Sequence, residues 1–266
     1  MPPAATENVA ATKVEAESCL NTMAPSSFSW QITLADKAIA ITGANCGIGL
    51  GIAEVCLANS AKFIYYLDLM EPGEDFAALR KRCSNLRYIQ PDVTSEGSIK
   101  KAINQVVHQP ALKFDREQLD QLFNLNVFGA YFCAQIVARK FIELGVKGSI
   151  VMTSTKNTGN HYFQAAPSAP YGATKAAVRN MCHTLAMEWS KHGIRVNSIS
   201  PGFVRTAMAY YVAKSPDWDL KMQYYDGMPC LADPKELGGA YAYLLSGSSS
   251  YTTGIDIPIA GLVGAW

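Results

Sequence analysis

Residues 37–60 read KAIAITGANCGIGLGIAEVCLANS, and this stretch decides the fold class. A short apolar run, residues 37–43, is followed by a glycine-rich turn and then by a helical pattern. A turn of this kind between a strand and a helix brings backbone N–H groups and a helix N-terminus up to a phosphate. Gly43, Gly47 and Gly49 are spaced by four and two residues, which departs from the G-x-G-x-x-G pattern. The alternative is that the glycines serve only the tight turn.

Strand and helix signals alternate along the rest of the chain. Further strands are expected at residues 62–69, 86–93, 148–155, 194–200 and 254–260. Helices are expected at residues 75–83, 116–144, 171–192 and 234–246, with aromatic-rich helical segments at 207–230. This alternation is typical of a parallel sheet covered on both faces. We therefore predict one α/β domain, a Rossmann-type doubly wound parallel sheet over residues 28–266, after a poorly ordered tail at residues 1–27.

The bulk composition excludes several classes of protein. The chain has 266 residues, 49% of them hydrophobic, and its net charge of +1 comes without a basic cluster, so neither nucleic acid nor an anionic membrane is an expected partner. No apolar run reaches the ~18 residues that a membrane-spanning helix needs, and the acidic N-terminal residues do not resemble a secretory signal. The seven cysteines lack C-x-x-C spacing, and the four histidines lack paired ligand spacing. We expect reduced thiols, a cytoplasmic protein and no metal site.

An acidic residue, Asp68, ends the second predicted strand, 19 residues after Gly49. A carboxylate at this point accepts hydrogen bonds from the adenosine ribose hydroxyls and repels a 2′-phosphate. The sequence therefore favours NAD over NADP as the cofactor. The alternative is an aspartate that only caps the next turn.

A tyrosine and a lysine, Tyr171 and Lys175, stand four residues apart in the stretch PYGATKAAV. Four residues make nearly one helical turn, so the two side chains share a face, and their small neighbours let a ligand approach closely. An ammonium beside a phenol favours the phenolate and lowers a pKa that is normally about 10. Such a tyrosine passes protons at neutral pH. The alternative is a core tyrosine with a lysine running past it.

Several motifs in order resemble the short-chain dehydrogenase/reductase family, over residues 35–93 and 114–266. TGANCGIG at residues 42–49 resembles the family's cofactor turn, and the Asp-Val pair at residues 92–93, the end of the third predicted strand, resembles its adenine-pocket acid. NVFG resembles the N-x-x-G of the central helix, YGATK the Y-x-x-x-K, and RVNSISPGFVRT the strand and loop beside the nicotinamide. SSYTTGIDIPIAG at residues 249–261 is similar to the polyol and sugar reductase branch, of the sorbose reductase kind.

The resemblance implies roles for individual residues. It makes Tyr171 the acid/base at the substrate oxygen, Lys175 the residue that lowers its pKa and holds the nicotinamide ribose, and Asn126 the holder of a water molecule. In the family, a hydroxyl at the end of the fifth strand, which corresponds to residues 148–155 here, positions the substrate oxygen. Thr155 is favoured for this role and Ser154 is the alternative, because only one of two neighbouring strand residues points at the tyrosine. The implied cofactor-binding residues are Gly43, Asn45, Gly47, Ile48, Gly49, Asp68, Asp92, Val93, Tyr171, Lys175, Pro201, Gly202, Val204 and Thr206.

The implied reaction is hydride transfer between NAD(H) and a secondary alcohol or its ketone: a polyol, a sugar alcohol or a small cyclic metabolite. Residues 155–164 and 203–230 are expected to form the substrate pocket, and the family resemblance implies a homo-oligomer, a dimer or a tetramer. Aromatic residues that could wall the pocket, or serve only as packing, are Tyr162, Phe163, Tyr210, Tyr211, Trp218, Tyr224 and Tyr225.

The chain departs from the family between Asp92 and Asn126, where a fourth strand and its Asn-Ala-Gly turn are absent, roughly twenty residues in all. That strand would lie in the middle of the sheet beside the cofactor. We expect the sheet to close, either by direct pairing of the first strand with GSIVMTST (residues 148–155) or by recruitment of residues 103–109. The alternatives are a binding protein that has lost catalysis and a truncated gene model.

Overall fold

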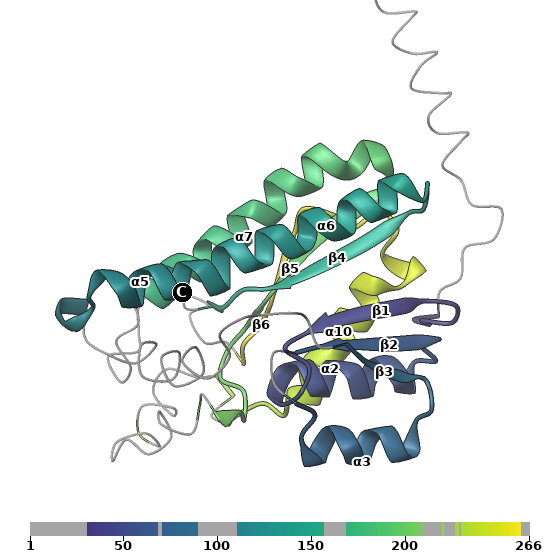
Figure 1. The fold of residues 1–266 in the computed structure, drawn as a ribbon, viewed down its shortest axis with the longest axis horizontal. Coiled ribbons are helices and arrows are strands. Elements are labelled where there is room, and N and C mark those ends of the chain that lie inside the picture. The colour runs from purple at the N-terminus through teal and green to yellow at the C-terminus, as the bar shows by residue number, and fades with distance from the viewer. Residues whose placement is uncertain are drawn as a thin grey trace, which may run out of the picture. The chain divides into compact units, whose positions relative to one another are not determined.

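The computed structural model describes residues 31–68, 71–89, 111–156, 169–207, 209, 220, 227–228 and 230–261. The described residues from Ile32 onward belong to one compact unit. Helices alternate with parallel strands in this unit, which confirms the predicted α/β class (Figure 1). In the described ranges, no helix is long and apolar enough to cross a membrane. The predicted tail at residues 1–27 lies outside these ranges, and its boundary stays a prediction.

The first strands form a three-stranded parallel ladder in the order β1-β2-β3. Its strands are β1 (Ala38–Thr42), β2 (Phe63–Leu67) and β3 (Leu86–Ile89). The helices that follow β1 and β2 are α2 (Gly47–Ala58) and α3 (Glu74–Arg82). Side chains alternate between the two faces of a strand. Ile64 and Tyr66 of β2 therefore share a buried face, and they lie in one core with Phe76 of α3.

The later strands form a second parallel ladder in the order β4-β5-β6. Its strands are β4 (Gly148–Thr153), β5 (Ile194–Pro201) and β6 (Asp256–Ile259). Between β4 and β5 runs α7 (Ala169–Trp189), followed by the 3₁₀ turn η4 (Ser190–His192) and by Gly193 in the left-handed region, with φ of 71°. The core under α7 includes Val178, Cys182 and Met152.

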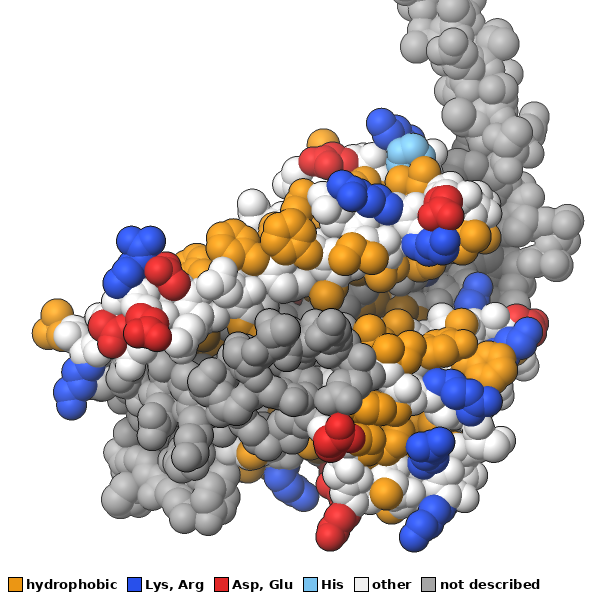
Figure 2. Space-filling view, viewed as in Figure 1, with side chains coloured by type: hydrophobic (Ala, Val, Ile, Leu, Met, Phe, Trp, Pro, Cys, Tyr) orange, Lys and Arg blue, Asp and Glu red, His pale blue; other side chains and the backbone are white. Residues whose placement is uncertain are grey.

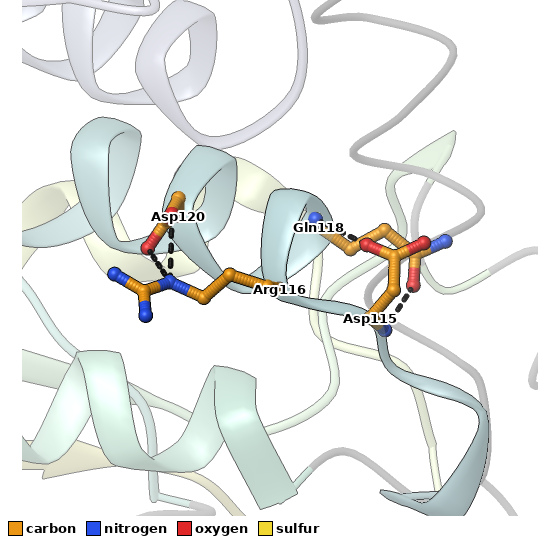
Figure 3. A network of polar contacts seen from close by, with 4 residues as sticks. All are labelled: Asp115, Arg116, Gln118 and Asp120. Carbon is orange, nitrogen blue, oxygen red and sulfur yellow. Dashed lines mark hydrogen bonds and ion pairs between the residues drawn. The ribbon is translucent and has the colours of Figure 1, made fainter.

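The predicted helix over residues 116–144 is confirmed as a continuous helical run. It consists of α5 (Arg116–Phe123), the π-helical segment η2 (Asn124–Gly129) and α6 (Ala130–Glu143), and the short 3₁₀ turn η1 (Ala111–Lys113) precedes it. A capping box begins α5: Asp115 Oδ1 accepts from the Gln118 N–H at 2.8 Å, and Gln118 Oε1 accepts from the Asp115 N–H at 3.2 Å (Figure 3). Both bonds satisfy N–H groups that a helix start would otherwise leave unpaired.

Helix α10 (Pro234–Leu245) joins the two ladders, and the turn η5 (Gly247–Ser249) follows it. It packs along α2, and it also contacts β4 and β5. The two helices approach closely because glycine stands at their crossing: a Cβ on Gly51 would lie 2.7 Å from Pro234. An ion pair of 2.7 Å between Lys235 Nζ and Glu54 Oε2 adds to the contact.

Strands β1 and β4 belong to separate ladders. Direct pairing of the first strand with GSIVMTST, one of the two expected ways to close the sheet, is therefore wrong. Side-chain packing through α10, which contacts α2 and β4, links the two ladders in place of backbone pairing. Ala38, Ala40 and Thr42 of β1 are exposed. The other closure, by residues 103–109, falls outside the described residues.

Candidate active site

The glycine-rich turn has the geometry of a phosphate cradle. Gly43 and Gly47 lie in the left-handed region, with φ of 67° and 59°, and a Cβ on Gly49 would overlap the carbonyl oxygen of Gly43. Glycine at all three positions therefore lets the backbone fold tightly and brings the start of α2 to the end of β1. A helix N-terminus placed in this way binds an anion with its backbone N–H groups. The residues present fit the pyrophosphate of a dinucleotide.

The loop after β5 lies beside this turn. A Cβ on Gly47 would meet Thr206 Cγ2 at 3.3 Å, so predicted cofactor residues from two distant segments come together. Pro201 ends β5, and the Gly202 N–H donates to the Ile259 carbonyl oxygen at 2.9 Å. Val204 forms an isolated bridge with Ala232. Ile48 lies in the first turn of α2, whereas Asp92 and Val93 fall outside the described residues.

Asp68, at the end of β2, is bonded to the turn. Its Oδ2 accepts from the Asn45 N–H at 2.9 Å. The Asn45 side chain in turn holds the loop after β2: its Nδ2 donates to the Glu71 carbonyl at 2.6 Å, and its Oδ1 accepts from the Gly73 N–H at 2.9 Å. Capping of the turn that follows β2, the alternative for Asp68, stays a prediction; the structure shows instead a hydrogen bond that Asp68 accepts from the turn after β1. This bond does not exclude ribose binding, because a carboxylate has about four acceptor sites.

Tyr171 and Lys175 lie on one face of α7, as their spacing predicts. Lys175 Nζ is 5.9 Å from the centroid of the Tyr171 ring. The same Nζ donates to the carbonyl oxygen of Thr153, the last residue of β4, at 3.0 Å. Both side chains are partly buried.

The pKa of Tyr171 shifts in the direction opposite to our expectation. Burial raises the pKa of Tyr171 to about 12 and lowers the pKa of Lys175 to about 8. The expected lowering of the Tyr171 pKa by the ammonium is wrong for this structure. The physical reason is that desolvation penalises both charges, while Lys175 directs its ammonium at the Thr153 carbonyl.

Both candidate hydroxyls, Ser154 and Thr155, lie directly after β4. Ser154 Oγ donates to the carbonyl oxygen of Lys175 at 2.8 Å, and the Ser154 side chain is 2% exposed. This bond ties the end of β4 to α7, and the Ser154 hydroxyl satisfies a backbone carbonyl. Thr155, the next residue, is 8% exposed.

Asn126 reaches α7 through a residue that the sequence did not single out. Asn126 Nδ2 donates to Thr174 Oγ1 at 3.1 Å, and Thr174 Oγ1 donates to the Tyr171 carbonyl oxygen at 2.8 Å. Asn126 lies in the π-helical segment η2, a geometry often found at functional sites. The available signal for Thr174 was its place three residues after Tyr171, where a hydroxyl bonds back to its own helix.

The predicted substrate pocket is only partly described. All seven predicted aromatic wall residues lie outside the described residues. Among the described side chains, no group of three metal-ligating residues comes together.

Comparisons with known proteins agree with this geometry. A protein-family model described as "Enoyl-(Acyl carrier protein) reductase" matches residues 43–261. The chain is 29% identical to 2-dehydro-3-deoxy-D-gluconate 5-dehydrogenase of Dickeya dadantii, over 86% of this chain and 95% of that protein. It is 29% identical to a sorbose reductase of Candida albicans, over 89% and 90%.

Solved structures agree as well. The crystal structure of an NADPH-dependent 3-quinuclidinone reductase from Rhodotorula rubra matches with a TM-score of 0.76 and 27% identity, over 91% of this chain and 98% of that one. A short-chain type dehydrogenase/reductase from Mycobacterium marinum matches with a TM-score of 0.74 and 27% identity, over 86% and 96%.

The fold and the family match define a nicotinamide-dependent oxidoreductase. The chain belongs to the short-chain dehydrogenase/reductase family. It acts on alcohol and carbonyl groups of a small molecule with NAD(H) or NADP(H), and the resemblance predicted from the motifs is confirmed.

Proposed function

We propose that this protein is an NAD(H)-preferring reductase of a ketose or a related ketone, and the dehydrogenase of the corresponding secondary alcohol. The observation that carries the proposal is the Tyr171–Lys175 pair on α7, with Lys175 Nζ anchored on the end of β4. Relatives described as sorbose reductase, D-arabinitol 2-dehydrogenase and L-xylulose reductase support the sugar and polyol class. A panel of ketoses, polyols and small cyclic ketones, assayed with NADH and NADPH, identifies the substrate.

The chain's own residues divide the chemistry between them. Tyr171 gives its proton to the substrate oxygen in reduction and takes one back in oxidation. Because burial raises the pKa of Tyr171 to about 12, the phenol is protonated at neutral pH, which suits ketone reduction. Thr155 binds the substrate oxygen, while Asn126 supports α7 through Thr174. When bound, the nicotinamide supplies the hydride at carbon.

Replacing Tyr171 by Phe tests this assignment, because only the hydroxyl is removed. We expect the rate of ketone reduction to fall by about 10²-fold or more. NADH binding, followed by fluorescence, should stay within about twofold of the unmodified protein, because the turn at residues 42–49 is untouched. The exposed Tyr251→Phe is the matched control and should leave both properties unchanged. Retention of more than about a tenth of the rate in Tyr171→Phe would show that another group moves the proton.

The preference for NAD(H) rests on Asp68. A carboxylate fixed at the end of β2 by the Asn45 N–H is available to the ribose hydroxyls and opposes a 2′-phosphate. One relative is described as carbonyl reductase [NADPH] 2 of Sus scrofa, so cofactor use varies among similar proteins. We expect Asp68→Ala to weaken NADH binding and to narrow its advantage over NADPH. Tighter binding of NADPH than NADH by the unmodified chain contradicts the role of Asp68.

A second candidate function is a protein that binds the dinucleotide without turnover. The observation that favours it is the separation of β1 from β4, because these strands flank the cofactor in the family fold. The discriminating result is NADH binding without conversion of any compound in the panel. A second chain with a strand and Asn-Ala-Gly turn restored after Gln109 serves for comparison. Thermal melting of both chains, with and without NADH, then measures how much the missing segment lowers stability and NADH binding.

A homo-oligomer is the expected assembly, and α5–α6 offers a surface for it. Phe128, Phe132 and Ile136 recur every four residues and are 51%, 54% and 65% exposed. Figure 2 shows hydrophobic side chains gathered along this helix.

The assembly and its compartment can both be measured. Phe132→Glu should shift a dimer or tetramer toward smaller species in sedimentation velocity, while the exposed Tyr251→Glu should not. An unmodified chain that sediments as a monomer contradicts the assembly. A cytoplasmic location is proposed from the cysteines, because the six in the described ranges are all free thiols.

A further inference from the structure

A buried contact outside the predicted site ends on the residue that holds Lys175. Thr153 Oγ1 and the hydroxyl of Tyr241 lie 2.6 Å apart, although 88 positions separate them in the chain. Tyr241 belongs to α10 and is 4% exposed. Thr153 ends β4, and its carbonyl oxygen accepts from Lys175 Nζ at 3.0 Å. The side chain of Thr153 is thus bonded to Tyr241 of α10, and the carbonyl oxygen of Thr153 is bonded to Lys175 of α7.

The Tyr241 hydroxyl stays neutral under all ordinary conditions. Burial raises the pKa of Tyr241, the hydrogen bond with Thr153 opposes this, and the nearby Asp256 carboxylate raises it further. Asp256 is itself fixed, because Ser198 Oγ donates to Oδ1 at 2.5 Å and Ser200 Oγ donates to both carboxylate oxygens at 2.9 and 2.8 Å. Because the Tyr241 hydroxyl stays neutral beside the fixed Asp256 carboxylate, its hydrogen bond with Thr153 does not change with pH.

The contact matters because β1 and β4 do not pair. Helix α10 packs on α2, which starts at the glycine-rich turn, and also contacts β4, which ends just before Ser154 and Thr155. The bond between Tyr241 and Thr153 is a direct polar link between α10 and the end of β4. In a continuous sheet, ladder hydrogen bonds would fix this strand end relative to the cofactor turn.

We propose that Tyr241 is a positioning residue for the reaction: through Thr153 it fixes the carbonyl that orients the Lys175 ammonium beside Tyr171. A lysine side chain has many rotamers, so a fixed acceptor selects one of them. Misplacement of a reacting group by about 1 Å costs on the order of 10²-fold in rate. This inference rests on the proposed function, in which Lys175 and Tyr171 form the acid/base site.

The test compares two tyrosines on the same helix. Tyr241→Phe keeps the ring and removes the hydroxyl from Thr153, whereas Tyr243→Phe removes a hydroxyl bonded to Thr252 Oγ1 at 2.9 Å, away from the site. We expect Tyr241→Phe to lower kcat about tenfold with less than a twofold change in KM for the ketone, and Tyr243→Phe to change neither.

The pH profile separates positioning from a purely structural role. A carbonyl that accepts from an ammonium favours its charged form, so a loosened Thr153 carbonyl should move the alkaline limb of the kcat profile to lower pH. Thr153→Val should reproduce this shift, and Thr153→Ser, which keeps the hydroxyl, should restore the original profile. The double variant Tyr241→Phe with Thr153→Val should be no worse than either alone, because both break one link.

A readout without turnover keeps this inference separate from the proposed function. Acetylation of Lys175 by an activated ester, followed by mass spectrometry across pH, reports the pKa of its amine in any folded variant. A lower pKa in Tyr241→Phe and Thr153→Val, with no change in Tyr243→Phe, supports positioning even if the substrate panel fails. Unchanged Lys175 reactivity and an unchanged kcat profile, together with lower melting temperatures, would assign Tyr241 to packing alone and overturn the proposal.

Discussion

Replacing Tyr66 by Phe should stabilise the protein. Tyr66 is 1% exposed, and among the described residues its hydroxyl has no hydrogen-bond partner. A buried polar group left unpaired costs about 1–3 kcal/mol, whereas the ring contact with Phe76, at a centroid distance of 4.5 Å, survives the change. Removing the oxygen loses little packing, so we expect a net gain of about 1 kcal/mol in the free energy of unfolding.

Calorimetry and urea unfolding measure this gain. For a chain of this size, about 1 kcal/mol corresponds to a rise of roughly 2–4 °C in the melting temperature, and the urea midpoint should rise without a change in slope. Tyr88→Phe is the matched control on the neighbouring strand: its hydroxyl donates to the Asp68 carbonyl at 3.4 Å, so its loss should be neutral or destabilising. Burial raises the pKa of Tyr66, so the gain should be equal at pH 6 and pH 9. A lower melting temperature for Tyr66→Phe would refute the reasoning and reveal a partner for the hydroxyl.

Three further changes test other features. Burial lowers the pKa of Lys175 to about 8 from its usual 10.5. The charged amine therefore lowers the free energy of unfolding below pH 8, and this destabilisation fades as the pH rises toward 10.5. Lys175→Met should raise the free energy of unfolding by on the order of 2 kcal/mol at pH 7 and by little at pH 10.5, measured by urea titration at both pH values. Gly51→Ala should destabilise by about 1–3 kcal/mol, since its Cβ would lie 2.7 Å from Pro234, while Gly239→Ala, whose Cβ meets no described atom within 4 Å, should not. Asp115→Ala removes the cap of α5 and should cost about 1 kcal/mol, with Asp115→Asn largely restoring the melting temperature.

Local geometry was predictable from the sequence. The strand, turn and helix of residues 37–60 follow from short-range patterns, and α2 begins at Gly47 within the predicted turn. The shared face of Tyr171 and Lys175 follows from helical pitch alone. The long helix over residues 116–144 was equally readable, although no pattern indicated that its middle, at Asn126, would widen into a π-helical segment.

Features that depend on distant partners were not predictable. The pKa direction of Tyr171 is set by burial, which sequence spacing does not give. The bond of the Ser154 hydroxyl to the Lys175 carbonyl comes from the packing of α7 on β4, which strand alternation does not give. Tyr241 carried no motif, because its contact with Thr153 comes from the packing of a helix far along the chain.

The packing of α10 on α2 also constrains how the chain is made. Ile39 and Ile64 share a core with Leu237 and Leu244, so the first ladder cannot complete its core until nearly the whole polypeptide has left the ribosome. At a synthesis rate of about 5–20 residues per second, the apolar face of the first strands stays uncovered for roughly 10–40 s before α10 is made. Contacts this distant in sequence slow folding, and they expose a nascent chain to aggregation and to chaperones. Moving residues 234–261 to a position before β1 by circular permutation would shorten that wait.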